Sequence, residues 1–163
     1  MVIYVRLILF RHGEAEEKKP DQRDEDRALT DKGRRDVELV AKLLPWPPSR
    51  IYSSPLRRAV ETAQIISSIY GAGYEVSEYL RPDKLSLEVI SRLSLVDNTV
   101  LVGHAPSIEE LLSQIIGGGK IRLKSGSAAG LELDELKIGA GRLIYIITPD
   151  IINSKLLKEA GLS

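Results

Sequence analysis

The chain has 163 residues, a length suited to one domain around a single hydrophobic core, and its 23 basic and 23 acidic side chains leave no formal net charge. This balance gives no support for nucleic-acid binding, because nucleic-acid-binding domains usually carry a basic excess. Cysteine is absent, which excludes disulfides, thiol catalysis and cysteine-ligated zinc, and two histidines are too few for a histidine-rich metal site. We therefore expect a single domain over residues 1–163 that uses neither a metal nor a cofactor.

The first predicted element is a strand over residues 2–10, which are rich in Val, Ile, Leu and Phe. This apolar stretch contains Arg6 and is too short to span a bilayer. It also lacks a small-residue cleavage site of the kind that follows a signal peptide. We interpret it as a buried strand and expect a cytoplasmic protein that does not bind a membrane.

The highly charged residues 14–28 that follow indicate a solvated loop. Thr30 can cap a helix that extends to about Leu44, where the prolines of residues 45–48 end it. Farther along, Ser54 followed by Pro55 is typical of a helix start, with a capping residue and then proline at the first helical position. The other predicted elements are strands at 51–53, 75–79, 99–102, 128–133 and 142–148, and helices at 55–70, 84–94, 106–116 and 150–160.

Strands alternate with helices along nearly the whole chain, a pattern that predicts an α/β fold with a mostly parallel sheet. In such a sheet the ligand site lies beyond the carboxyl ends of the strands. Three predicted strands end in reactive sequence: residues 11–13 (RHG), 53–58 (SSPLRR) and 103–106 (GHAP). Both histidines should therefore share one face of the protein. Two of these turns lead into helix N-termini, which favour phosphate.

Histidine can attack phosphorus only through a free nitrogen of its neutral ring. Its usual pKa of about 6.5 leaves much of it neutral in a cell, and nearby guanidinium groups disfavour protonation further. The same guanidiniums suit the equatorial oxygens of a transferring phosphoryl group. A phosphohistidine intermediate would constitute covalent catalysis, with electrostatic stabilisation of the transition state.

Residues 9–14 (LFRHGE), 54–63 (SPLRRAVETA) and 101–104 (LVGH) together resemble the histidine phosphatase superfamily, the phosphoglycerate-mutase-like proteins, in the order typical of that family. The resemblance implies a three-layer phosphoglycerate-mutase-like fold, with a mostly parallel central sheet flanked by helices. It implies His12 as the nucleophile, with Arg11, Arg58 and His104 completing a catalytic phosphate pocket. Arg58 rather than Arg57 occupies the family position, and adjacent helical residues point about 100° apart.

Within the superfamily, the chain is most similar to the small SixA-type phosphohistidine phosphatases, because it is short and has no room for the large inserted lid of the mutases. Residues 27–30 (RALT) resemble the Arg-Pro-Leu-Thr segment of that group, which implies that Arg27 also contacts phosphate. Residues 125–135 resemble its C-terminal small-residue run and strand. The resemblance implies an enzyme that removes phosphate from phosphohistidine in a protein.

The chain departs from the family at the proton donor, a carboxylic acid two residues after a leucine. Here Leu80 is followed at that spacing by Pro82, with Glu78 and Asp83 nearby. An alkoxide leaving group needs a proton, whereas a protonated imidazole leaves without one, so the gap favours a phosphohistidine substrate.

Two alternative functions stay open. One is a phosphomonoesterase or mutase that acts on a small phosphorylated substrate and uses Glu78 or Asp83 as acid. The other is a phosphoryl-binding module without turnover. Among single residues, His104 could be a core histidine, Arg58 an exposed helix residue, and Arg27 a solvated loop residue.

Overall fold

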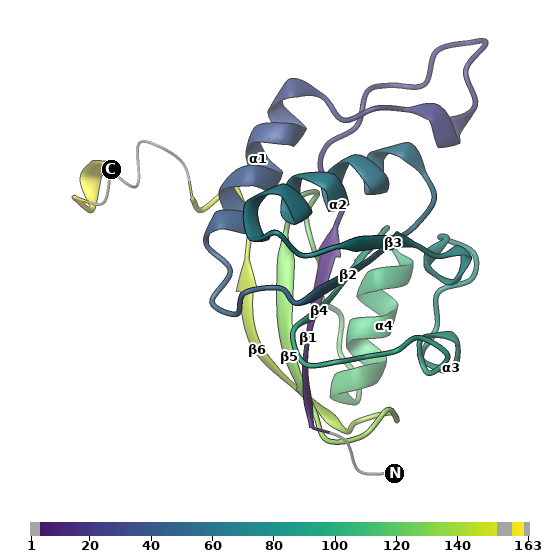
Figure 1. Ribbon diagram of the computed structural model, residues 1–163, viewed down its shortest axis with the longest axis vertical. Helices are drawn as coiled ribbons and strands as arrows, with labels where there is room; N and C mark the ends of the chain where they lie inside the picture. Colours follow the sequence, from purple (N-terminus) through teal and green to yellow (C-terminus); the bar gives the residue numbers. More distant parts are fainter. Residues whose placement is uncertain (1–3, 153–157, 162–163) are drawn as a thin grey trace.

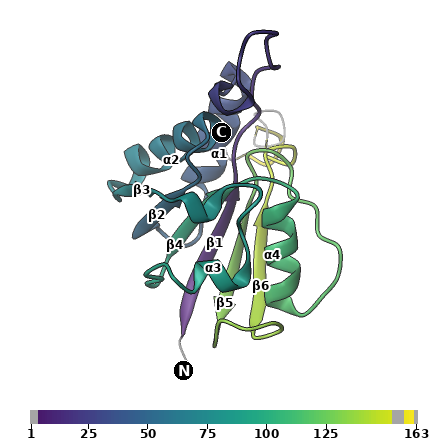
Figure 2. The same cartoon turned by 90° about the vertical axis from the view of Figure 1, so that its right-hand side faces the viewer.

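The computed structural model describes residues 4–152 and 158–161 of the chain. A six-stranded sheet forms the middle layer, and two pairs of helices cover its opposite faces (Figures 1 and 2). The strands are β1 Val5–Arg11, β2 Arg50–Ser53, β3 Tyr74–Val76, β4 Thr99–Gly103, β5 Ala128–Leu133 and β6 Gly141–Ile147. The helices are α1 Asp31–Lys42, α2 Arg57–Tyr70, α3 Leu87–Ile90 and α4 Ser107–Ile116, with short 3-10 turns η1 Asp24–Asp26 and η2 Glu78–Leu80.

The strand order is β3-β2-β4-β1-β5-β6, which places β1 and β4 side by side near the centre. The pairings β1–β4, β4–β2 and β2–β3 are parallel, whereas β5 pairs antiparallel with β1 and with β6. The predicted α/β fold with a mostly parallel sheet is therefore confirmed. The parallel half brings the carboxyl ends of β1, β2 and β4 to one edge of the sheet.

The apolar run of β1 is explained by its central position, where both faces are buried. Leu7 and Leu9 contribute to the core cluster on the side of α3 and α4. Ile8 and Phe10 contribute to the second cluster, on the side of α1 and α2. Because strand side chains alternate between faces, one apolar strand ties both halves of the core together.

Capping residues account for several helix ends, but neither α2 nor α4 has a side-chain cap at its start. Thr30 caps α1, since its hydroxyl accepts a hydrogen bond from Gly33 N at 2.9 Å, and Gly71 ends α2 in the left-handed conformation. The predicted start of α2 at Ser54 is wrong, because the helix begins at Arg57. Ser54 instead forms a turn in which its hydroxyl accepts from Leu56 N at 3.3 Å.

The region between β3 and β4 differs most from the prediction. The predicted strand at 75–79 ends at Val76, because Ser77 caps the 3-10 turn η2. The predicted helix at 84–94 is only the four-residue α3; beyond it, Arg92 and Leu93 donate to carbonyls three residues back, so the chain tightens into turns. The predicted helix at 150–160 lies mostly on residues outside those described. None of the helices within 4–152 and 158–161 has the length and apolar character needed to cross a membrane.

Candidate functional site

The three predicted reactive segments meet at the carboxyl edge of the parallel strands. Arg11 at the end of β1 pairs with Gly103 at the end of β4, and His12 N donates to Gly103 O at 3.1 Å. Beside them, Ser54 N donates to Val102 O at 3.1 Å. A pocket of about 470 Å³ lies at this edge. The structure brings all five candidate side chains to its wall: Arg11, His12, Arg27, Arg58 and His104.

His12 has a defined tautomer. Its Nδ1 lies 2.7 Å from the carbonyl oxygen of Gly13, and a carbonyl can only accept, so Nδ1 carries the proton and Nε2 keeps its lone pair. Burial lowers the pKa of His12 to about 4; the hydrogen bond to Gly13 opposes this shift, and the nearby arginine charges add to it. His12 is therefore a neutral imidazole with a nucleophilic Nε2 at neutral pH.

Gly13 allows α1 to pack closely behind this ring. A Cβ at Gly13 would lie 2.8 Å from both the carbonyl oxygen of Gly33 and a methyl carbon of Val37. The amide of Gly13 also donates to Thr62 Oγ1 at 3.1 Å, which fixes the turn against α2. Gly13 thus has a packing role that the sequence motif did not predict.

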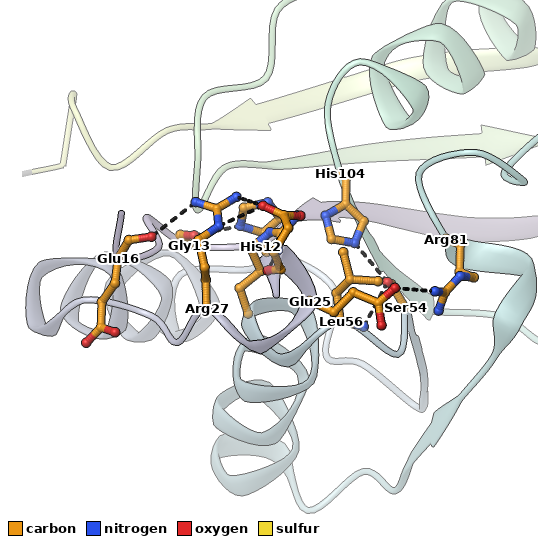
Figure 3. A network of polar contacts seen from close by, with 11 residues as sticks. His12, Gly13, Glu16, Glu25, Arg27, Ser54, Leu56, Arg81 and His104 are labelled. Carbon is orange, nitrogen blue, oxygen red and sulfur yellow. Dashed lines mark hydrogen bonds and ion pairs between the residues drawn. The ribbon is translucent and has the colours of Figure 1, made fainter. Parts of the chain in front are cut away.

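His104 faces His12, with their ring centroids 4.9 Å apart, and is 2% exposed. Its Nε2 lies 2.8 Å from Ser54 Oγ, whereas its buried Nδ1 has no hydrogen-bond partner (Figure 3). Burial, followed by the proximity of His12 and Arg58, lowers the pKa of His104 to about 3. Sequence reasoning assigned Ser54 to a helix cap and missed its contact with His104.

Arg11 and Arg58 contribute partly desolvated guanidinium groups. Arg11 Nη1 donates to Leu123 O at 2.7 Å, and its Nε is buried without a partner. The Nε of Arg58 is also unpartnered, and the side chain, in the first turn of α2, is 7% exposed. The neighbouring Arg57 side chain is exposed and lies 3.6 Å from Glu61, so one of the two arginines faces the pocket.

Arg27 reaches the pocket because the two ends of the loop 14–28 are tied together. A bridge pairs Ala15 with Leu29, and Glu16 N donates to Ala28 O at 2.8 Å. From this position Arg27 Nη1 donates to Glu16 O at 3.1 Å (Figure 3). The Nε of Arg27 donates to an Asp24 carboxylate oxygen at 2.9 Å.

The two carboxylates considered as proton donors do not line the pocket. Glu78 has a 65% exposed side chain and lies 3.4 Å from Arg81, and Asp83 is exposed. Pro82 occupies the wall instead. The carboxylates that do line it are Glu14 and Asp24, neither of which sequence reasoning singled out. Asp24 lies three residues before Arg27, in a loop with so many charged residues that the sequence did not distinguish it from the others.

The pocket is suited to an anion and a nucleophilic reaction. Three arginine side chains line its wall, and guanidinium groups donate hydrogen bonds to anionic acceptor oxygens, so the pocket favours a ligand that carries such oxygens. A neutral imidazole beside them can attack an electrophilic centre that these arginines hold and polarise. Within the described residues, no group of three or more His, Cys, Asp or Glu side chains is arranged to hold a metal ion.

Comparisons with known proteins point to a phosphatase family. Residues 7–82 match the family model of the histidine phosphatase superfamily (branch 1). An uncharacterized chloroplastic protein of Arabidopsis thaliana is 30% identical over 144 residues, which cover 78% of this chain and 66% of the relative, so the chain spans just under two thirds of that protein.

Two solved structures are similar over almost their whole length. The protein histidine phosphatase SixA complexed with tungstate has a TM-score of 0.78 at 21% identity, covering 91% of this chain and 100% of that one. A putative phosphohistidine phosphatase SixA from Agrobacterium tumefaciens has a TM-score of 0.75 at 26% identity, covering 89% and 98%.

Proposed function

Because the chain belongs to the histidine phosphatase superfamily, we propose that it is a phosphatase in which His12 carries the phosphoryl group between substrate and water. The observation that carries this proposal is the hydrogen bond from His12 Nδ1 to Gly13 O, which leaves Nε2 free at the wall of an arginine-lined pocket. Arg11, Arg27, Arg58 and His104 hold the phosphoryl oxygens.

In the first step, His12 Nε2 attacks phosphorus in line with the leaving group. A P–N bond to His12 forms while the bond from phosphorus to the leaving atom breaks, and the leaving atom keeps the electron pair. The guanidinium groups of Arg11 and Arg58 balance the charge on the equatorial oxygens, which is where they contribute most to the rate.

In the second step, water attacks the phosphorus of phosphohistidine. The P–N bond to His12 breaks, the ring recovers its lone pair at Nε2, and the proton of the water passes to phosphate or solvent. Since His12 returns to the neutral form favoured by its lowered pKa, it is ready for another cycle at neutral pH.

We propose phosphohistidine in a protein as the substrate. A protonated imidazole leaves without a general acid, and the position at which the family carries that acid is Pro82. The two carboxylates at the wall are already engaged, Glu14 by the hydroxyl of Thr30 and Asp24 by two arginines. The similarity to the SixA structures, one of a protein histidine phosphatase and one of a putative phosphohistidine phosphatase, supports the same choice. We also propose a cytoplasmic location. The proposed reaction needs no metal, because three arginines at the pocket already supply the positive charge.

The two alternatives find less support. A small-molecule phosphomonoesterase or mutase with Glu78 or Asp83 as acid needs a carboxylate at the pocket wall, and neither lines it. A binding module without turnover has no need for a neutral imidazole whose Nε2 is left free.

The test is a comparison of initial rates, in a chelator, on a phosphohistidine-bearing protein and a panel of phosphate monoesters. We expect the phosphohistidine protein to be dephosphorylated fastest and His12→Ala to abolish the reaction. A monoester turned over faster would contradict the proposed substrate. Turnover by His12→Ala equal to the parent's would contradict the mechanism, and loss of activity in the chelator would contradict metal independence.

A further inference from the structure

The 3-10 turn η1 consists of three consecutive acidic residues, and each is paired with arginine. Asp26 lies 3.0 Å from Arg23 within the same loop. Glu25 lies 2.6 Å from Arg81, which fastens η1 to the segment after η2 (Figure 3). Asp24 alone of the three lines the pocket. Asp24 therefore differs in position from Glu25 and Asp26, although all three are acidic residues of the same turn.

Asp24 engages two of the guanidiniums that the proposed function assigns to the phosphoryl group. One carboxylate oxygen accepts from Arg27 Nε at 2.9 Å, and the other accepts from Arg58 Nη2 at 3.1 Å. The main-chain oxygen of Asp24 accepts from Arg58 Nη1 at 3.0 Å. Burial raises the pKa of Asp24, but the charges of Arg58 and Arg27 outweigh it and hold the pKa below its usual value. Asp24 is thus an anion bound at the phosphate pocket.

In the ion pair between Asp24 and Arg58, the Asp24 carboxylate is the group that can move away. The Asp24 side chain is 53% exposed and belongs to a three-residue turn within a loop, whereas the Arg58 side chain is 7% exposed and rooted in α2. A carboxylate and a phosphoryl group both accept hydrogen bonds from the edge of a guanidinium, and two anions at one edge repel each other. One arginine edge therefore serves either Asp24 or the phosphoryl oxygens.

On the basis of the proposed function, we propose that Asp24 is a specificity-determining residue that competes with phosphate for Arg27 and Arg58. A phosphorylated substrate displaces the carboxylate on entry, and the carboxylate returns to these arginines after hydrolysis and helps to release inorganic phosphate. A phosphorylated protein differs from free phosphate because it is large enough to contact the surface around the pocket as well. Asp24 therefore biases the pocket against small phosphate anions.

The test measures binding and needs no turnover. Inorganic phosphate is titrated calorimetrically into the parent protein, Asp24→Asn and Asp26→Asn at constant ionic strength, because salt screens these charges. Asp24→Asn keeps the shape and the main-chain oxygen but removes the competing charge. Asp26→Asn makes the same charge change in the same turn without a contact to Arg27 or Arg58.

We expect Asp24→Asn to bind phosphate roughly threefold to tenfold more tightly than the parent, a modest factor because half-exposed ion pairs are weak. Asp26→Asn should bind within about twofold of the parent, since its partner Arg23 lies outside the pocket. Phosphate binding by Asp24→Asn that is no tighter than the parent's would overturn the proposal, as would an equal gain in Asp26→Asn. No binding by any of the three proteins would contradict the proposed function itself.

A second variant keeps the proposal testable if Asp24→Asn does not fold. Glu25→Gln releases η1 from Arg81 without touching the pocket guanidiniums, which loosens the turn that holds Asp24 in place. We expect a smaller gain in phosphate affinity in the same direction. Unchanged or weaker phosphate binding by Glu25→Gln would count against the competition.

Discussion

The pocket floor, formed by Arg11, His12 and His104, and the pocket rim, formed by residues 14–28 and 78–83, are held in place in different ways. The floor residues lie at or directly after the ends of central strands, and main-chain hydrogen bonds between those strands fix their positions. The rim is held largely by ion pairs between side chains, such as Glu25–Arg81 across its two segments. The sheet therefore places the reactive group, whereas access to the pocket and its preference among anions depend on ion pairs that single substitutions can remove.

Among the side chains around His12, substitution of Arg58 should reduce kcat/KM the most. Arg58→Met removes a desolvated guanidinium, and we expect kcat/KM to fall roughly 10²- to 10³-fold, as when a donor to a developing oxyanion is lost. The matched control is Arg57→Met, which removes the same charge from the adjacent, exposed position and should leave kcat/KM within about threefold. Equal losses in the two variants would show that overall charge, rather than the placement of Arg58, matters.

A smaller effect is expected at Ser54, which links the second strand end to the floor. Ser54→Ala removes the 2.8 Å partner of His104 Nε2, so the ring loses its fixed orientation. We expect kcat to fall about tenfold, comparable to the loss of a group that orients an active-site histidine, with the far-ultraviolet dichroism unchanged. The control is Ser53→Ala, whose hydroxyl donates to Ser54 O and does not touch His104. Full activity of Ser54→Ala would mean that packing alone orients His104.

The buried floor should also make stability depend on pH. His12 and His104 have pKa values of about 4 and about 3 in the folded protein, against about 6.5 in an unfolded chain. Between pH 7 and pH 5 the unfolded chain binds protons that the folded protein does not, so the free energy of unfolding should decrease, by about 2 kcal/mol per histidine. Urea unfolding at both pH values measures this change. The variant His12→Asn should lose about half of it, and a parent protein equally stable at both pH values would contradict the lowered pKa values.

The smallest effect is expected for the rim carboxylates outside the pocket. Glu78→Gln and Asp83→Asn should each change turnover of a phosphohistidine protein by less than about twofold, because neither side chain reaches the pocket wall and a general acid would contribute about 10²-fold or more. Initial rates on that protein and on a monoester check this. Loss of monoester turnover in either variant would identify a proton donor and favour the phosphomonoesterase alternative.

The pocket floor could be predicted from the sequence because local sequence patterns reveal the strands that carry it. The apolar run of β1 predicts a buried central strand, and parallel pairing then places Arg11 and Gly103 at one edge. The start of α2 was predicted wrongly because Ser54 and Pro55 satisfy the capping rule, whereas the Ser54 hydroxyl is engaged by Leu56 N and His104. A partner 50 residues away leaves no local signal.

The rim depends on contacts between distant residues, which local patterns do not encode. Whether Arg27 reaches the pocket depends on the bridge between Ala15 and Leu29. Asp24 meets Arg58 across 34 positions of the chain, so nothing near Asp24 in the sequence distinguishes it from the acidic residues that follow it. The same limit applies to the helix predicted at 84–94, because nothing in that stretch of sequence revealed the tighter turns that follow Ile90.

The role of His12 as phosphoryl carrier is tested most directly by locating the trapped phosphoryl group in the sequence. The protein is mixed with a phosphohistidine-bearing protein, quenched in alkali, in which phosphohistidine survives, and its peptides are sequenced by mass spectrometry. We expect phosphorylation on the peptide that contains His12, located at that residue, and none in His12→Asn. A phosphoryl group on His104, or rapid turnover by His12→Asn, would contradict the assignment of His12 as the phosphoryl carrier.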